Sequence, residues 1–383
     1  MSEPHRWQIA SRVVHAGVGQ DPLYGSVTTP IYQTVTYQHA GAGLGRFDYS
    51  RTDNPTRDSV GRALADLEGG AAASVFASGM AAITALFHLL GQGVHVVLTE
   101  DLYGGTYRLL EDVFRPFGLS ATFVDTRDVD RVQAALRPET RLVFVETPSN
   151  PLLRVSDIQA LAALAHAHGA WLAVDNTFMT FALQRPLALG ADLVVYSATK
   201  YLAGHNDVLA GAVIAREAAL GERLAYIANA TGGVLAPLDS YLLLRGLKTL
   251  DVRLERQQAN AELIVAQIAS HPAVARVHYP TLHAQDAAVQ RRQARGSGGM
   301  VSFRLVDPNG APRLMDNLRL ILPAVSLGGV ESLITHPYSE THREFPEPLR
   351  RALGFVPGLM RLSVGIEHGD DLVADLVQAL DTL

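Results

Sequence analysis

The chain of 383 residues contains only two lysines, Lys200 and Lys248, although Lys and Arg together number 32. Arginine therefore supplies nearly every positive charge, and the amine at position 200 needs a reason. A guanidinium stays protonated and is a poor nucleophile, whereas an ammonium shielded from water can lose its proton and form a Schiff base. Lys200 follows an apolar run and the sequence Ser197-Ala-Thr. We therefore predict an imine-forming lysine rather than a surface lysine that arginine has not replaced.

An aldehyde cofactor on Lys200 would need an anion site, an acid beside its ring nitrogen and a flat group against its face, and pyridoxal phosphate makes all three demands. Asp175, which ends another apolar run, could pair with the ring nitrogen, and Tyr103 could stack on the ring. Four groups could hold the phosphate: the backbone N–H groups of Gly79 and Met80 at a helix N-terminus, and the hydroxyls of Ser197 and Thr199. Each residue alone also has a structural explanation, as a cap, a turn residue or a packed aromatic. Their joint order along the chain favours the cofactor.

The elements that must position these residues alternate from residue 71 onward, with short apolar runs between helical patterns. This alternation is typical of a wound α/β domain with a mainly parallel sheet. Strands are expected at 94–98, 122–124, 142–146, 171–175, 193–196 and 211–214, with helices ending near 67, opening at Ser78, and covering 105–114, 129–136 and 157–168. Ligands of such sheets lie at the carboxyl ends of the strands. Glu146, Asn150, Asp175, Ser197 and Lys200 fall there.

Three regions are expected along the chain. Residues 1–55 have little periodicity and are read as an extended N-terminal arm, and residues 56–237 form the α/β domain. Residues 238–383 form a smaller α+β domain, which begins with one helical segment at 238–270 and has strands at 274–279, 301–305 and 360–364 and a last helix at 370–380. The expected architecture is therefore two domains with an arm that could reach a partner subunit.

The composition limits the alternatives. With 48% hydrophobic residues, 18% charged residues and a net charge of −6, the chain indicates a globular protein with no nucleic-acid or membrane partner. Without cysteine it has no disulfide or thiolate site, and a start without an apolar signal core indicates a cytoplasmic protein. A metal enzyme is disfavoured because His166 and His168 cannot share a ligand face on a helix. A nicotinamide enzyme is disfavoured because the glycine-rich segment 41–45 follows no apolar strand.

The sequence resembles the Cys/Met-metabolism family of pyridoxal-phosphate enzymes, of fold type I, over nearly its whole length. The resemblance rests on the motifs Asp48-Tyr-Ser-Arg51, Asn54-Pro-Thr-Arg57, Ser78-Gly-Met80, Tyr103-Gly-Gly-Thr106, Glu146-Thr-Pro-Ser-Asn-Pro151, Asp175-Asn-Thr177, Ser197-Ala-Thr-Lys-Tyr201, Ser326-Leu-Gly-Gly-Val-Glu-Ser332 and Arg361-Leu-Ser-Val-Gly-Ile-Glu-His368.

The resemblance implies roles for the matching residues. Lys200 would hold the cofactor and move protons, Asp175 would bind the ring nitrogen, and Tyr103 would stack on the ring and assist proton transfer. The phosphate would also contact Tyr49 and Arg51 of a neighbouring subunit, as part of a homotetramer built from two catalytic dimers. The substrate α-carboxylate would bind Asn150, Ser326 and Arg361, and Asn150 would also lie near the cofactor's phenolic oxygen.

Within the family, Gly105 replaces the cysteine usual in methionine γ-lyases, and Leu327 replaces an aromatic residue that follows the serine in some bacterial β-lyases. Asp48 and Glu331 resemble the acidic pair that meets the distal ammonium of cystathionine. Because synthases tend to have aspartate at position 48, we expect a cystathionine γ-synthase-like γ-replacement on an O-acylhomoserine by cysteine. The alternatives are a cystathionine γ-lyase, then a cystathionine β-lyase, and, outside enzymes, a regulatory protein that keeps the cofactor fold.

Overall fold

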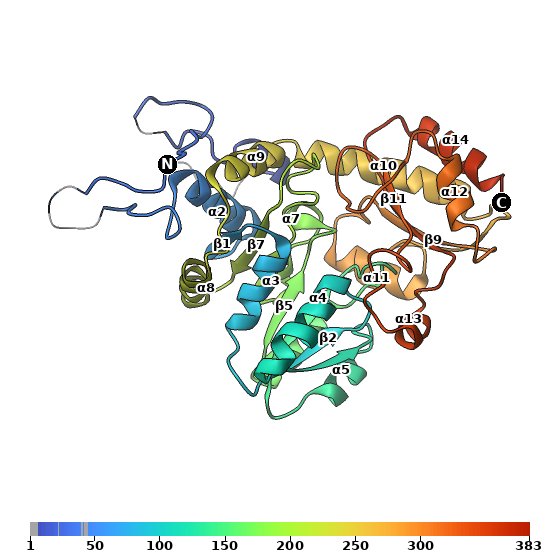
Figure 1. Cartoon of the computed structure of the whole chain (residues 1–383), viewed down its shortest axis with the longest axis horizontal. Helices are drawn as coiled ribbons and strands as arrows, with labels where there is room; N and C mark the ends of the chain where they lie inside the picture. Colours follow the sequence, from blue (N-terminus) through green and yellow to red (C-terminus); the bar gives the residue numbers. More distant parts are fainter. Residues whose placement is uncertain (1–6, 22, 40, 42–44) are drawn as a thin grey trace.

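The computed structural model describes residues 7–21, 23–39, 41 and 45–383. The glycine-rich segment 41–45 falls largely on residues 42–44, which lie outside the described residues, as do residues 1–6 at the start of the chain. Figure 1 shows a larger α/β body beside a smaller one, with the N-terminal segment projecting from the end of the larger body. None of the described helices is long and apolar enough to cross a bilayer.

A seven-stranded sheet forms the centre of the larger body, in the order β1-β7-β6-β5-β4-β2-β3. Its strands are β1 Ala72–Phe76, β2 His95–Thr99, β3 Ser120–Val124, β4 Thr140–Glu146, β5 Trp171–Asp175, β6 Leu193–Tyr196 and β7 Gly211–Ala215. β7 runs antiparallel to both of its neighbours, and the other pairs are parallel. The mainly parallel wound sheet expected from the sequence is therefore confirmed.

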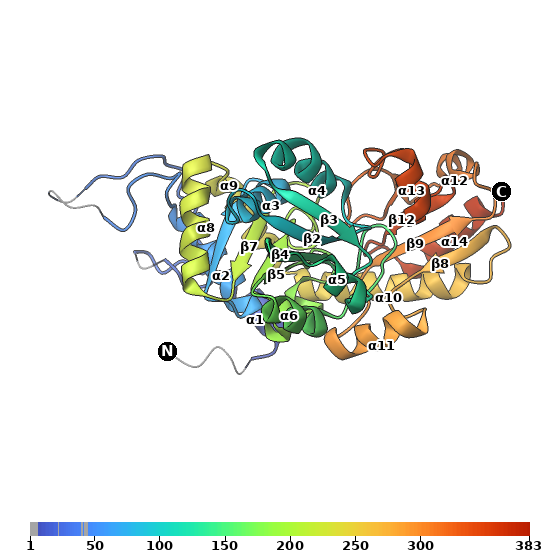
Figure 2. The same ribbon diagram turned by 90° about the horizontal axis from the view of Figure 1, so that it is seen from below.

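Helices cover both faces of this sheet, as the two views in Figures 1 and 2 show. They are α2 Pro55–Glu68, α3 Gly79–His88, α4 Gly104–Arg108, α5 Val129–Ala135, α6 Ile158–Ala167, α7 Thr180–Leu183 and α8 Ala218–Thr231, with a π-helix Leu109–Phe114 and 3₁₀ turns Arg115–Phe117 and Pro186–Leu189. Successive side chains of a strand point to opposite faces. Val194 and Tyr196 accordingly join one hydrophobic core, while Leu193 and Val195 join another.

The segment expected as one helix at 238–270 is two helices, α9 Pro237–Leu247 and α10 Leu250–Ile268. Gly246, in the last turn of α9, packs against the loop that follows Lys200, since a Cβ there would lie 2.2 Å from the backbone oxygen of Ala203. α9 therefore lies close to the loop that contains Lys200 and belongs to the larger body. Leu250 and Leu254 of α10 belong to the core of the larger body, whereas Ile264 and Ile268 belong to that of the smaller one.

The smaller body is a five-stranded sheet in the order β10-β11-β12-β9-β8, covered by helices. Its strands are β8 Val274–His278, β9 Met300–Leu305, β10 Leu322–Pro323, β11 Leu333–Thr335 and β12 Leu359–Ser363, and its helices are α11 Ala284–Gln293, α12 Ala311–Asn317, α13 Glu347–Leu353 and α14 Gly369–Leu380. The domain boundary at 237/238 stays a prediction, since the two cores meet along α10.

The N-terminal segment contains one short helix, α1 Ile9–Val14, that the sequence pattern did not indicate. Val13 of this helix is fully buried in the core of the larger body. Beyond it the segment presents large apolar side chains to solvent, among them Leu23, Tyr24 and Val27, each more than 70% exposed. Most of the described residues between α1 and α2 are thus exposed or partly exposed, while α1 itself is anchored.

Candidate active site

Lys200 lies in the loop that follows β6, at the carboxyl edge of the large sheet. Its backbone N–H donates to the carbonyl of Ser197, and its Nζ donates to Oγ of Ser326 at 2.8 Å. Burial, together with the nearby guanidinium of Arg361, lowers the pKa of Lys200 to about 8. A sizeable fraction of this amine is therefore uncharged near neutral pH, as a Schiff-base nucleophile requires.

Arg361 projects from β12 of the small domain toward Lys200. It donates from one guanidinium nitrogen to Oδ1 of Asn150 at 2.9 Å and from the other to the carbonyl of Ser326 at 3.1 Å. Its side chain is 2% exposed, and burial lowers its pKa to about 10. In the described part of the chain no carboxylate forms an ion pair with it. A buried guanidinium that lacks a counter-ion and meets only neutral oxygens is a ready receptor for a ligand carboxylate.

Two carboxyl groups end neighbouring strands, because Glu146 of β4 is paired with Asp175 of β5. Oδ1 of Asp175 accepts from the backbone N–H of Thr177 at 3.0 Å, and Oε2 of Glu146 accepts from the backbone N–H of Tyr103 at 3.0 Å. Burial raises the pKa of both groups, and the charge of Asp175 raises that of Glu146 further. Oε1 of Glu146 has no donor among the described residues. A cation brought beside this pair would relieve the repulsion between the two carboxylates.

The N-terminus of α3 leaves two backbone donors free for an anion. The N–H groups of Ala81 and Ala82 are satisfied by the hydroxyl and carbonyl of Ser78, which caps the helix. Those of Gly79 and Met80 have no acceptor among the described residues. A Cβ at Gly79 would lie 2.8 Å from Cβ of Ser197, so only glycine allows the loop of Ser197 this close. The helix dipole and these donors favour a phosphate at this point.

The expected phosphate ligands are not all equivalent. Thr199 lines the cavity, but its hydroxyl already donates to the carbonyl of Ala210 at 3.1 Å and accepts from the N–H of the same residue. A phosphate oxygen would have to compete with the carbonyl of Ala210 for the hydroxyl proton of Thr199. The hydroxyl of Ser197 has no such contact in the described structure, since the contact of Ser197 with Thr177 uses its backbone N–H.

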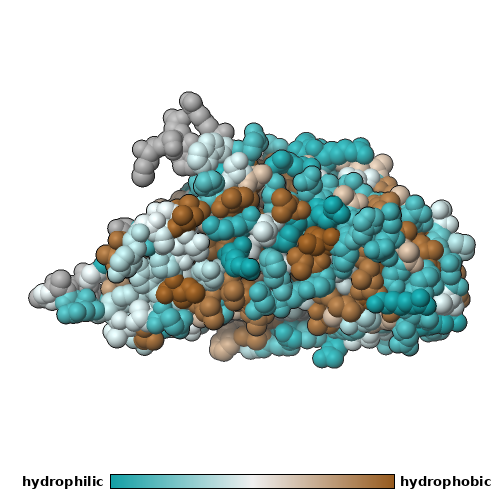
Figure 3. Space-filling view, turned by 90° about the horizontal axis from the view of Figure 1, so that it is seen from above, coloured by the Kyte–Doolittle hydropathy of each residue, from teal (hydrophilic) through white to brown (hydrophobic). Residues whose placement is uncertain are grey.

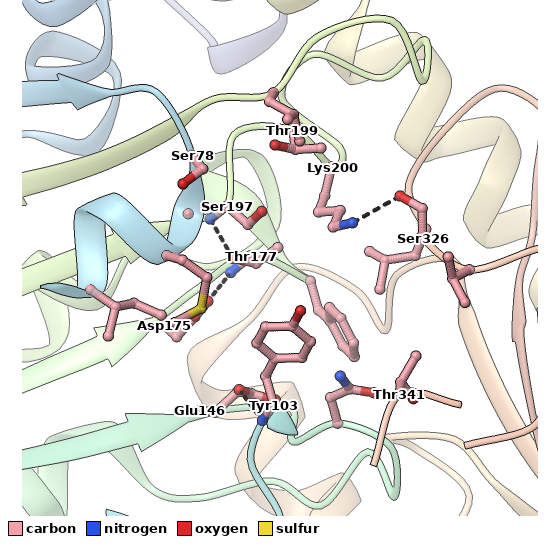
Figure 4. A pocket seen from close by; sticks show the side chains of 18 of the residues that line it. Ser78, Tyr103, Glu146, Asp175, Thr177, Ser197, Thr199, Lys200, Ser326 and Thr341 are labelled. Atoms are coloured by element: carbon pink, nitrogen blue, oxygen red, sulfur yellow. Dashed lines mark hydrogen bonds between the residues drawn. The ribbon is translucent and has the colours of Figure 1, made fainter. Parts of the chain in front are cut away.

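All these side chains line one cavity of about 400 Å³. Figure 4 shows Lys200 directed toward Ser326 on one side of it, Ser78, Ser197 and Asp175 on the other, and Tyr103 between them. The cavity is of the size typical for small-molecule sites. Its free helix N-terminus, its buried acid pair and its desolvated amine fit the phosphate, the ring nitrogen and the aldehyde of pyridoxal phosphate.

Four predicted site residues lie outside this cavity: Asp48, Tyr49, Arg51 and Glu331. Arg51 stacks over the ring of Tyr49 and donates to the carbonyl of Asn229 at 2.7 Å. Oδ1 of Asp48 accepts from the backbone N–H of Tyr49, and Oε2 of Glu331 accepts from the side-chain amide of Asn206 at 2.8 Å. A single chain does not bring these residues to Lys200, so their roles stay predictions.

The cavity also contains residues that the sequence reasoning assigned no role. The sequence pattern puts Glu146 at a strand end and predicts no function for it, although its register with Asp175 follows from the parallel sheet. Thr177 lies two positions after Asp175, and its hydroxyl holds the N–H of Ser197 at 2.9 Å, which fixes the loop that leads to Lys200. Thr341 and the apolar residues Leu209 and Val325 line the wall from loops without any sequence signal.

A scan against family models matches residues 10–381 to the family described as Cys/Met metabolism PLP-dependent enzyme. The chain is 45% identical to a cystathionine gamma-lyase of Bacillus subtilis, with 97% of this chain and 98% of the relative covered. It is 44% identical to a cystathionine beta-lyase of Lactococcus lactis, with 97% and 99% covered. Its structure superposes on that of a cystathionine gamma synthase from Xanthomonas oryzae in complex with cystathionine, with a TM-score of 0.95, 42% identity and 98% of each chain covered. With its fold, its site and these relatives in agreement, the chain belongs to the Cys/Met-metabolism family of pyridoxal-phosphate-dependent trans-sulfuration enzymes.

Proposed function

We propose that the protein catalyses a γ-replacement of the cystathionine γ-synthase type. In this reaction the bond between Cγ of an O-acylhomoserine and its ester oxygen breaks, the acyl group leaves as a carboxylate, and the sulfur of cysteine takes its place. The thiol proton balances the charge of the leaving carboxylate. Both substrates and the product are α-amino acids, so the site must hold an α-carboxylate and move a proton at Cα.

The observation that carries this proposal is the position of Lys200 beside Ser326, Arg361 and Asn150. A substrate carboxylate seated on Arg361 would take the place of the neutral oxygens that the guanidinium now meets, and its Cα would lie near Nζ of Lys200. With a pKa of about 8, the freed amine can accept the Cα proton and return it elsewhere on the substrate. Bound pyridoxal phosphate supplies the electron sink that makes this proton acidic.

The choice of a γ-replacement rests on the acidic residues expected at the far end of the substrate. Glu331 lies in the same loop as Ser326, and it is held by Asn206, which lies in the same loop as Lys200. Asp48 lies on the N-terminal segment, outside the cavity of its own chain. A second copy that placed Asp48 beside Glu331 would give the distal ammonium of cystathionine two carboxylates.

The same second copy would bring Tyr49 and Arg51 to the phosphate, as part of a homotetramer of two catalytic dimers. The exposed side chains of Leu23, Tyr24 and Val27 on the N-terminal segment favour such a contact, since large apolar residues clustered on a surface often mark an interface. Figure 3 shows apolar side chains spread among polar ones over one face of the molecule.

Mixed oligomers test this arrangement. Lys200→Ala and Arg51→Ala chains, each inactive alone, are expected to regain activity when co-expressed, because one of the two mixed sites keeps both native residues. No rescue in a purified hybrid that binds the cofactor would contradict a role of Arg51 across subunits.

A cystathionine γ-lyase is the second candidate, since a relative with that name is 45% identical to this chain. Paired reactions separate the possibilities. The purified holoenzyme is incubated with an O-acylhomoserine plus cysteine, and separately with cystathionine. A γ-synthase forms cystathionine in the first reaction and leaves it largely intact in the second. Cysteine with 2-oxobutanoate in the second would indicate a γ-lyase, homocysteine with pyruvate a β-lyase, and no turnover in either would favour a regulatory protein.

A further inference from the structure

A second cavity, of about 170 Å³, lies away from Lys200 at the joint between the two domains. Its wall comes from the loops after β3 and β4 of the large domain and from β8 and the start of α11 of the small one. Figures 1 and 2 both show α11 between the two bodies. The volume would hold on the order of ten water molecules, or one small amino acid. Nothing in the proposed function makes use of this cavity.

Three arginines line the cavity, and two of them are already neutralised. Arg127 pairs with Asp125 through two contacts, at 2.6 and 2.9 Å. Arg154 pairs with Glu100 at 3.0 Å, and its backbone N–H donates to the hydroxyl of Ser149, which holds it in a fixed turn. Arg276, on β8, forms no ion pair in the part of the chain that the structure describes. One guanidinium is thus left for a ligand.

The helix α11 contributes a buried negative group to the same cavity. Asp286, in the first turn of this helix, is only 6% exposed, and its Oδ1 is buried without a donor among the described residues. Nε2 of His283, at the start of the same helix, is also buried without a partner there. Burial raises the pKa of Asp286, and the charge of Arg127 opposes this rise. A buried carboxylate oxygen without a hydrogen-bond donor costs free energy, so the carboxylate of Asp286 is suited to bind a cationic donor.

We propose that the cavity binds a small zwitterionic α-amino acid, with its carboxylate on Arg276 and its ammonium on Oδ1 of Asp286. A simple anion would meet Arg276 but would lie close to the carboxylate of Asp286. A simple cation would satisfy Asp286 but would leave the guanidinium of Arg276 without a counter-ion. Only a ligand with both charges satisfies the two free groups together, and His283 then adds a hydrogen bond to the ligand. The proposal does not depend on which bond the catalytic site breaks.

Equilibrium dialysis of the holoenzyme against labelled L-alanine tests the proposal. Binding in the catalytic cavity is followed separately, through the absorbance of the cofactor. We expect a further equivalent of L-alanine per chain that leaves this absorbance unchanged. Asp286→Asn and Arg276→Gln should each weaken this second equivalent about tenfold or more, as expected for loss of a charge-assisted hydrogen bond. Arg291→Gln, an exposed position on the same helix, should leave it unchanged.

Two analogues of the same size test the charge requirement. L-lactate lacks the ammonium and L-alaninamide lacks the carboxylate, so each should bind at least about tenfold more weakly than L-alanine. Equal binding of L-lactate would overturn the zwitterion proposal in favour of an anion site. The absence of a second equivalent, or one that Asp286→Asn leaves unaffected in a protein with wild-type circular dichroism and cofactor content, would overturn it as well.

Discussion

Replacement of Arg361 by methionine is expected to separate the stability of this protein from its activity. Arg361 is a buried cation whose hydrogen bonds, among the described residues, go to the oxygens of Asn150 and Ser326. Burial lowers its pKa to about 10, which corresponds to a cost of roughly 3 kcal/mol for keeping the charge in the folded protein. Methionine follows the arginine side chain only as far as Nε and has no charge, so the Arg361→Met substitution removes this cost together with the guanidinium group.

The same substitution leaves two acceptors without donors, at about 1–3 kcal/mol each. The two effects have opposite signs, and the unfolding free energy of the protein should rise by at most about 1 kcal/mol or fall by at most about 3 kcal/mol. The substrate carboxylate, in contrast, loses two charge-assisted hydrogen bonds. At about 1.5–3 kcal/mol for each bond, kcat/KM should fall by roughly 10²- to 10⁴-fold.

Arg253 provides a matched control, because it is also a buried arginine with a pKa that burial lowers to about 10. It lies outside the cavity and donates to the carbonyls of Tyr201 and Gly246 and to the hydroxyl of Thr249. Arg253→Met should therefore destabilise the protein more than Arg361→Met and reduce kcat/KM less.

Urea unfolding of both variants and steady-state kinetics with an α-amino-acid substrate provide the measurements. A loss of more than about 4 kcal/mol in Arg361→Met would show that Arg361 is a structural residue. A kcat/KM within threefold of wild type would show that the substrate carboxylate binds elsewhere. Either result would refute the reasoning.

Three further expectations concern the amine, a buried acid and the ring of Tyr103. The rate at which the apoprotein recombines with pyridoxal phosphate should rise about tenfold for each pH unit up to about pH 8 and stay constant above it, since Lys200 reacts as the free amine. Stopped-flow absorbance measures this rate. A rate that does not change between pH 6 and 8 would contradict the expectation. Glu68 is buried, and burial raises its pKa to about 8. Between pH 4.5 and about 8 the folded protein therefore keeps a proton that the unfolded chain releases. The unfolding free energy falls as the pH rises through this range. Glu68→Gln should remove this fall and stabilise the protein by up to about 4 kcal/mol at pH 8 but little at pH 4.5 in urea unfolding, and equal gains at both values would count against it. In Gly105→Ala the new Cβ would lie 2.4 Å from the ring of Tyr103, so the ring must move. We expect a shifted absorbance spectrum of the bound cofactor and a kcat/KM about tenfold lower than that of the wild type. An unchanged spectrum would rule out contact between the ring and the cofactor.

The centre of the fold could be predicted from sequence because it consists of continuous apolar runs that end at polar residues. The runs at 171–175 and 193–196 coincide with β5 and β6, and their ends placed Asp175 and Lys200 at one edge of the sheet. Local pattern and tertiary environment agree here, since a strand buried on both faces is apolar throughout.

Other elements depend on contacts that no local pattern records. β1 has the weak strand sequence Ala-Ala-Ser-Val-Phe, and it pairs antiparallel with β7, which is far away in the chain. β10 and β11 have two and three residues, too short to show a period. α8, with 14 residues, packs against β1 and β7, and the sequence analysis did not place it.

The site residues also differ in how far the sequence could predict their positions. The residues proposed for the steps common to the family, Lys200, Asp175 and Arg361, lie on strands or just after a strand end within one chain, and burial shifts their pKa values. The residues expected to select the reaction, Asp48 and Glu331, lie on loops, and in the proposed arrangement Asp48 would act in the site of a second chain. Strand ends are determined by the core, whereas loops tolerate substitution without loss of the fold. This explains why relatives named γ-lyase and β-lyase share 44–45% identity with one chain. The substitution Asp48→Glu should therefore change the ratio of cystathionine synthesis to cystathionine cleavage in the paired reactions and leave cofactor binding unaltered. A changed cofactor affinity with an unchanged ratio would indicate instead that Asp48 belongs with the residues that bind the cofactor.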